Sequence, residues 1–245
     1  MLITKNTSPQ DLSEYIKNLR EQKGKEGEVL EVINSALGFG HDFVVNLFWE
    51  EALTYQHVVM NDSSNRKALL KMQESILKGK FYITKYKLVH WNSRLYRFLG
   101  RHSDYKGEYK KSVNYYKKAL KFYKSDPDIK LGLPRNLELE AFLSFSLIMS
   151  GSFDKGCKLA KTTYSKFFET KEGKNLKKLD NQTWGIWMSG ITIRTIGAFL
   201  DKKLLFNRKE FRSWLSETEK FLKPTSLFSY RLGEIENLKL KLFSD

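Results

Sequence analysis

The chain has 245 residues, 41% of them hydrophobic, so it can bury a substantial core, which excludes disorder as a description of the whole. It contains only four prolines, and its many Leu, Lys, Glu and Phe residues favour helices over strands. The single cysteine, Cys157, excludes an intramolecular disulfide framework and a multi-thiolate metal site. This cysteine usage fits a reducing compartment, and we expect a cytoplasmic protein.

The formal net charge of +15 is unevenly distributed. Residues 91–125 contain ten Lys or Arg but two Asp or Glu, so this stretch carries the largest share of the excess. The first ten residues, MLITKNTSPQ, lack the basic region and apolar run of a signal peptide. Residues 183–200 are apolar but short for a bilayer crossing and include Arg194, so we expect a buried helix and no membrane contact.

Apolar residues recur at helical spacing along nearly the whole chain and predict helices joined by short loops. Ser8 as a cap, Pro9 in the first helical position and Asp11 in the first turn mark the start of the first helix. Asn207 with Glu210 resembles a capping box for a later helix. About eleven helices are predicted, at residues 9–24, 27–37, 41–60, 66–79, 81–102, 108–124, 136–149, 153–168, 184–200, 207–222 and 226–243.

Two longer connections interrupt this succession. Residues 125–134, SDPDIKLGLP, are the clearest loop and have room for a short extra helical turn. Residues 170–178 are charged and contain a glycine, so we expect a connection there, with Asp180 or Asn181 capping the helix that follows.

Residues 91–124 form two amphipathic patterns around a turn, and their spacing is the most repeat-like in the chain. The positions that carry this spacing are Tyr96, Leu99, Gly100, Gly107, Tyr109, Ser112, Tyr116 and Ala119. The pattern resembles a tetratricopeptide repeat, a unit of two antiparallel helices. In such a unit, glycine and serine at these points let the helices approach closely, and we expect Tyr109 and Tyr116 to fill the groove between hairpins.

A second copy of the pattern follows the first. Its members are Leu143, Ser144, Gly151, Phe153, Gly156 and Ala160. It begins 44 residues after the first copy rather than the family's usual spacing of about 34, and the extra residues fit in the loop at 125–134. Ser103 and Lys124 depart from the family pattern, which has an aromatic residue and a proline there. Hairpins at 43–77 and 184–222 match in length alone.

The resemblance implies an all-α fold, specifically a right-handed α–α superhelix. We expect a tetratricopeptide-like solenoid of about five antiparallel helical hairpins, forming a single domain over residues 1–245. The best repeat match covers residues 91–170, and residues 224–245 are expected to form a C-terminal capping helix.

Arg94, Arg97 and Arg101 lie at i, i+3 and i+7, on one stripe of a helix. The resemblance implies that this stripe lines a concave groove that receives a partner peptide. A guanidinium offers paired donors in one plane, which suits a carboxylate or phosphate. The candidate binding residues are Arg94, Arg97, Arg101 and Tyr105. An ordinary solvated face remains the alternative interpretation.

Lys110, Lys117, Lys121 and Lys124 form a second basic stripe on the next helix. We expect this stripe to be a solvated outer face. Its charge and interleaved tyrosines are also typical of a nucleic-acid patch, so binding of RNA or single-stranded DNA is the alternative function.

Motifs of catalysis are not found. The cluster at residues 48–57 mixes Glu50, Glu51 and His57, but no Glu-x-x-His or His-Glu-x-x-His spacing occurs, and no glycine-rich phosphate loop or nucleophile elbow is present. We expect structural histidines, an inert Cys157, and neither an enzyme nor a metal or cofactor site. The predicted function is a non-catalytic protein-interaction module that binds an acidic peptide or protein surface in a basic groove, inferred from the resemblance.

Overall fold

The computed structural model describes residues 8–36, 40–204, 207–224 and 228–243, and every regular element in these ranges is a helix. The predicted all-α class is therefore confirmed for them. Residues 1–7, the end of the second predicted helix at 37 and the start of the last one at 226 lie outside the described residues. The α-helices are α1 (Pro9–Arg20), α2 (Glu26–Ser35), α3 (His41–Asn61), α4 (Arg66–Lys85), α5 (Asn92–Tyr105), α6 (Tyr109–Phe122), α7 (Pro127–Lys130), α8 (Arg135–Met149), α9 (Phe153–Glu169), α10 (Lys171–Leu179), α11 (Asn181–Asp201), α12 (Arg208–Leu222) and α13 (Ser229–Phe243).

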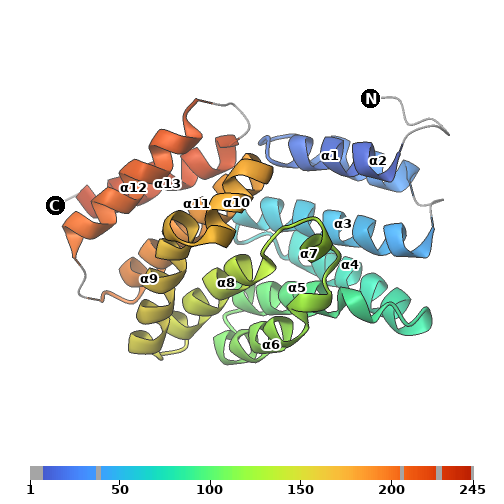
Figure 1. Ribbon diagram of the computed structural model, residues 1–245, viewed down its shortest axis with the longest axis horizontal. Helices are drawn as coiled ribbons and strands as arrows, with labels where there is room; N and C mark the ends of the chain where they lie inside the picture. The colour runs from blue at the N-terminus through green and yellow to red at the C-terminus, as the bar shows by residue number, and fades with distance from the viewer. Residues whose placement is uncertain (1–7, 37–39, 205–206, 225–227, 244–245) are drawn as a thin grey trace.

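Neighbours in sequence are neighbours in space. The closest packing joins α3 to α4, α5 to α6 and α8 to α9, which are consecutive pairs. Each pair also packs on the next one, through α4 with α5, α6 with α8, and α11 with both α8 and α9 (Figure 1). The chain thus forms a succession of packed helix pairs.

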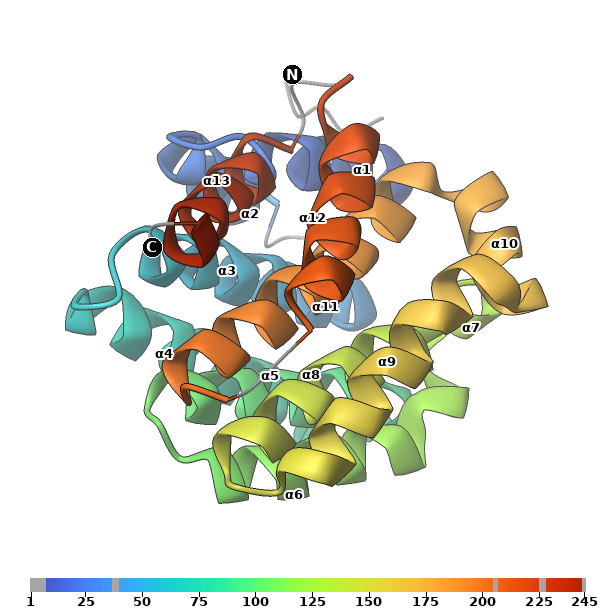
Figure 2. The ribbon, with the colours of Figure 1, turned by 90° about the vertical axis from the view of Figure 1, so that its left-hand side faces the viewer.

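The succession turns back on itself, so that its first and last helices meet (Figure 2). Asn61 Nδ2 at the end of α3 donates to the hydroxyl of Tyr230 on α13 at 3.1 Å. The backbone N–H of Lys23, after α1, donates to Ser229 Oγ at 3.3 Å. The last helix, for which the sequence predicts a capping role at one end, contacts the N-terminal part of the chain.

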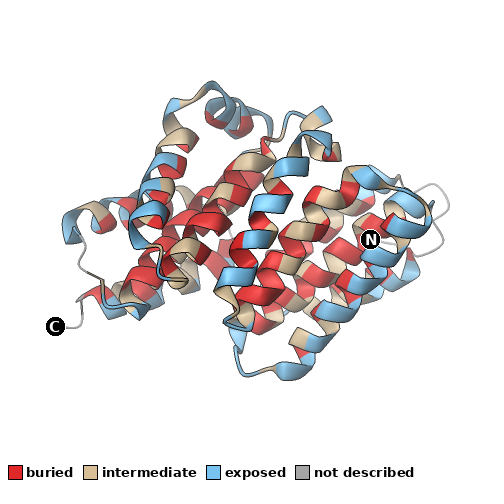
Figure 3. Ribbon diagram, turned by 90° about the horizontal axis from the view of Figure 1, so that it is seen from below, coloured by how far each residue is buried: buried red, intermediate tan, exposed pale blue. Residues whose placement is uncertain are grey.

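Aromatic side chains fill the spaces between helices, and buried positions gather on the faces that point inward (Figure 3). Trp49 of α3 stacks on Phe98 of α5 with ring centroids 5.0 Å apart. Tyr116 of α6 stacks on Phe142 of α8 at 5.4 Å. Tyr116 therefore lies between successive pairs, as the repeat-like pattern predicted.

The predicted end of a helix at Gly79 is wrong. Helix α4 continues through Gly79 to Lys85. This glycine serves packing rather than ending the helix, since a Cβ there would lie 2.5 Å from the Trp49 ring. The chain breaks instead at Lys87, whose φ of 54° is left-handed, before a 3-10 turn at Val89–Trp91. The predicted single helix at 81–102 is therefore also wrong. The sequence pattern missed this break because no glycine or proline marks it.

The two longer connections contain helices. The short turn anticipated within residues 125–134 is α7, which is confirmed. The connection predicted at 170–178 is wrong, because α10 occupies most of it, with the Thr170 hydroxyl accepting from the N–H of Gly173 at 3.2 Å. Gly173 also serves packing, since a Cβ there would lie 2.2 Å from the carbonyl oxygen of Lys166.

The predicted caps are confirmed. Ser8 Oγ accepts from the N–H of Asp11 at 3.1 Å, and Asn207 Oδ1 accepts from the N–H of Glu210 at 3.2 Å. The apolar helix α11 is largely buried, with Trp184 only 1% exposed. Among the described residues, no helix is both long enough and apolar enough to span a membrane.

Two helical glycines, Gly156 of the repeat-like pattern and Gly197 of α11, make a testable distinction. A Cβ on Gly156 would lie 2.8 Å from the backbone nitrogen of Ile148, whereas a Cβ on Gly197 would meet nothing closer than 4.0 Å. We expect Gly156→Ala to lower the free energy of unfolding by about 1–2 kcal/mol, because backbone must move. Gly197→Ala should raise it by up to about 1 kcal/mol, because alanine favours the helix. Urea denaturation followed by circular dichroism measures both, and equal effects would contradict the close-packing role.

Candidate functional site

A cavity of about 1220 Å³ lies within the succession of helices. Its wall is built mainly by α1, α3, α5, α8 and α11, together with α7, the α10–α11 junction and one residue of α13. The helices α2, α4, α6, α9 and α12 contribute none of the described lining residues. We call the first five helices the inner layer and the second five the outer layer.

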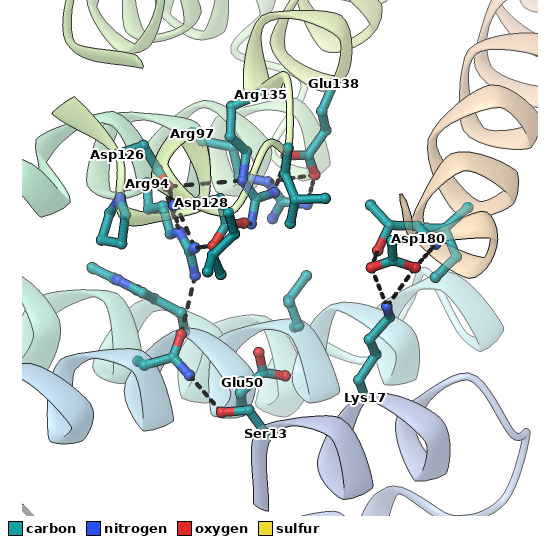
Figure 4. A pocket seen from close by; sticks show the side chains of 18 of the residues that line it. Ser13, Lys17, Glu50, Arg94, Arg97, Asp126, Asp128, Arg135, Glu138 and Asp180 are labelled. Atoms are coloured by element: carbon teal, nitrogen blue, oxygen red, sulfur yellow. Dashed lines mark hydrogen bonds and ion pairs between the residues drawn. The ribbon is translucent and has the colours of Figure 1, made fainter. Parts of the chain in front are cut away.

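One wall of the cavity holds largely buried arginines that are paired with carboxylates (Figure 4). Arg94 of α5 donates to Asp126 at 3.3 Å and also pairs with Asp128. Its Nη1 donates to Asn46 Oδ1 of α3 at 3.0 Å, so this one guanidinium connects α3 and α5 to the α7 segment. Asp126 is 1% exposed, so the pair is removed from solvent.

The same network continues to α8. Arg97 Nη2 of α5 lies 2.8 Å from Glu138, and Arg135 lies 2.6 Å from Glu138 and 2.5 Å from Asp128. Burial by itself raises the pKa of Glu138, but Arg97 and Arg135 together lower it to about 2. Arg135 and Arg94 likewise lower the pKa of Asp128 to about 2 against its burial. Both carboxylates are therefore ionised at neutral pH.

Local sequence explains how these acids reach the arginines. Asp126 is the N-cap of α7, its side chain accepts from the N–H of Asp128 at 3.0 Å, and Pro127 occupies the first helical turn. This cap fixes both aspartates on the side that faces α5. The Ser-Asp-Pro-Asp signal was visible in the sequence as a turn, but nothing local identified the arginines of α5 as its partners.

The opposite wall has a second buried polar cluster. Arg20 at the end of α1 pairs with Glu50 of α3 and lies 3.6 Å from Glu21, which is 2% exposed. His57 Nδ1 donates to the backbone carbonyl of Arg20 at 2.8 Å, and burial lowers the pKa of this imidazole to about 4. His57 is thus a neutral, hydrogen-bonded histidine at physiological pH.

An ion pair bridges the two ends of the inner layer (Figure 4). Lys17 Nζ of α1 lies 2.8 Å from Asp180, which also caps α11 by accepting from the N–H of Thr183 at 2.8 Å. The two side chains remain about a quarter exposed, at 23% and 25%. This contact joins helices that are 163 residues apart in the chain.

The structure divides the four predicted binding residues into two groups. Arg94 and Arg97 line the cavity, whereas Arg101 and Tyr105 are not among its lining residues. Arg101 donates to the hydroxyl of Tyr105 at 2.9 Å and lies 3.5 Å from Asp104. Each of the three arginines therefore has a carboxylate of the same chain beside it.

The wall as a whole is balanced in formal charge. Seven of the described lining residues are Lys or Arg and eight are Asp or Glu. Sequence reasoning missed these acids because they come from the α1, α3, α7 and α8 segments and the α10–α11 junction, all outside the helix that carries the arginine stripe. Within the described ranges, no group of three His, Cys, Asp or Glu side chains is placed to hold a metal ion.

The wall also holds polar atoms that the fold leaves unsatisfied. Nine buried side-chain nitrogen or oxygen atoms of the described residues have no hydrogen-bond partner. Seven of them belong to residues that line the cavity: Arg20, Glu21, Trp49, Arg135, Gln182, Arg194 and Arg231. Such atoms are few in folded proteins, and their concentration here marks this wall as a candidate site.

Comparison with known proteins adds no further assignment. No family model, curated protein or solved structure matches the chain. The site therefore rests on its own geometry.

Breaking the arginine network should be costly. Arg97→Met leaves Glu138 buried with one of its three charge-assisted hydrogen bonds, so we expect the free energy of unfolding to fall by about 3–5 kcal/mol. Lys71→Met is the matched control, because it removes an ion pair with Glu74 whose side chains are 45% and 53% exposed. That change should cost under about 1 kcal/mol. Urea denaturation measures both, and equal losses would show that the network is not a structural element.

Proposed function

We propose that the chain is a non-catalytic protein-interaction module that holds a segment of a partner protein in this cavity. The observation that carries the proposal is that one helix of each successive pair lines the cavity while the other covers the outside. This division between inner and outer helices is typical of helical-repeat proteins, which bind their partners on the inner surface. It supports a tetratricopeptide-like, right-handed solenoid as the architecture.

The size and chemistry of the cavity favour a peptide segment over a small metabolite. Its volume of about 1220 Å³ exceeds the range of about 300–1,000 Å³ that is typical of small-molecule pockets. Trp49, Trp91 and Trp187 line it together with the ion pairs, so the wall offers both apolar and polar groups. A peptide offers both kinds of group along one chain.

The proposed partner is an acidic peptide or protein surface. Because the wall is balanced in formal charge, its acidic groups would be bound by individual cations rather than by a uniformly basic groove. The cytoplasm is the proposed location, which the free, half-buried thiol of Cys157 supports.

A cavity-filling variant tests the proposal. Leu53 lines the cavity, whereas Leu77 lies on α4 with 51% exposure and outside it. Peptides selected from a random displayed library on the wild-type protein should be enriched in Asp and Glu and should bind Leu77→Trp normally. Leu53→Trp should weaken their binding about tenfold or more, or about 1.4 kcal/mol, because the indole occupies their space. Equal binding to both variants, measured by calorimetry, would sink the proposal.

A second candidate function is nucleic-acid binding on the outer layer. Lys110, Lys117, Lys121 and Lys124 are exposed on or just after α6, and none has a carboxylate within 4.0 Å among the described residues. Unpaired exposed lysines can bind phosphates and release counterions.

Single-stranded RNA distinguishes this candidate. If it is correct, a gel shift at low salt should weaken steeply as salt rises, by about 0.7 in log affinity per phosphate contact for each tenfold change in salt. A variant with the four lysines changed to Gln should lose the shift. Absence of a shift with the wild-type protein at low salt excludes nucleic-acid binding.

A further inference from the structure

The geometry points to an oxyanion-binding subsite at Arg194, which would take a single carboxylate or phosphate group of the bound ligand. The inference rests on the cavity proposed above as the binding site and names the ligand chemistry at one place in it. Arg194 lies on α11 and lines the cavity.

Arg194 differs from the other arginines of the wall because it has no anionic partner. Arg20, Arg94, Arg97, Arg135 and Arg231 each have a carboxylate within 4.0 Å. Among the described residues, no carboxylate lies within this distance of Arg194 and no hydrogen bond is made by its guanidinium. Its Nε is buried, whereas the residue as a whole is only half-buried, so the guanidinium lines the cavity without a partner in the chain.

The surroundings of Arg194 increase the local positive charge. Its guanidinium carbon lies 4.1 Å from the centre of the Phe142 ring, and those of Arg97 and Arg101 lie 4.8 Å and 5.3 Å from the same ring. Arg97 and Arg101 are compensated by carboxylates, but Arg194 is not. Burial, followed by the charges of Arg101 and Arg231, lowers the pKa of Arg194 to about 9.

The position of the guanidinium is set by the helix itself. A Cβ on Gly190, one turn earlier on α11, would lie 2.6 Å from Arg194 Nη2. The head group therefore folds back over Gly190 and is held between this glycine and the Phe142 ring. A planar guanidinium fixed in this way presents paired donors that match the geometry of a carboxylate or phosphate. A bound oxyanion would supply the missing counter-charge.

Titration with small anions tests the subsite directly. The probes are sodium acetate and sodium phosphate, added at constant ionic strength with sodium chloride as the balance. The arginine Nε–Hε signals are followed by NMR, and the Arg194 signal is assigned by its loss in Arg194→Met. It should shift and saturate with at least one probe, while the signal of exposed Arg66 should not. Saturation by acetate alone assigns a carboxylate ligand, and by phosphate alone a phosphate. The inference is overturned if the Arg194 signal shifts in parallel with the Arg66 signal, or if the Arg194 signal does not shift at all.

Stability measurements separate a binding role from a structural one. Without added anion, Arg194→Met should unfold at a temperature no lower than the wild type, because it removes a half-buried positive charge that has no carboxylate partner. The anion that saturates the Arg194 signal should raise the unfolding temperature of the wild type, and this increase should be absent in Arg194→Met. Gly190→Ala keeps the charge but displaces the head group, so it should remain folded and bind the probe more weakly. A strong loss of stability in Arg194→Met, or normal probe binding by both variants, contradicts the subsite.

The two proposals can fail separately. If the anion saturates the Arg194 signal but Leu53→Trp does not affect peptide binding, the subsite stands and the protein-interaction function fails. If peptides bind in the cavity but neither anion saturates the signal, the subsite is wrong and the interaction function stands. Arg66→Met is the matched control and should behave as the wild type in every measurement.

Discussion

The inner layer depends on one largely buried network, which joins Arg94, Arg97 and Arg135 to Asp126, Asp128 and Glu138. It joins α5 to α7 and α8 at the level where one helix pair follows the next. Desolvating so many charges is expensive, and it is tolerated only because each guanidinium has a carboxylate at short distance. Any one of these groups left alone would be a buried, uncompensated charge.

This network also determines what the cavity can bind. Three arginines that a basic groove would need are already neutralised by acids of the same chain. Attraction of an acidic ligand must then come from cations outside the network. Arg194 is such a cation, because it shares the Phe142 ring with two compensated arginines and has no carboxylate of its own. The contrast between paired and unpaired guanidiniums distinguishes groups that hold the fold from a group that the fold leaves available.

Side-chain contacts join the two ends of the helix succession. Lys17 with Asp180, and Asn61 with Tyr230, connect the N-terminal helices to α11 and α13. Because Lys17 and Asp180 are partly exposed, their pair contributes little to stability, and both residues line the cavity.

Local patterns in the chain were sufficient for the helical class, most helix positions, the caps at Ser8 and Asn207 and the role of Tyr116, because each depends on residues a few positions apart or on their hydrophobic periodicity. They misjudged Gly79 and Gly173, which resemble helix breakers in sequence but give room to the Trp49 ring and the Lys166 carbonyl in space. The arginine stripe was visible from its spacing, whereas its neutralisation was not. Whether a guanidinium is paired depends on which carboxylate lies beside it, and that is decided by contacts between helices dozens of residues apart, so only the folded chain separates Arg97 from Arg194.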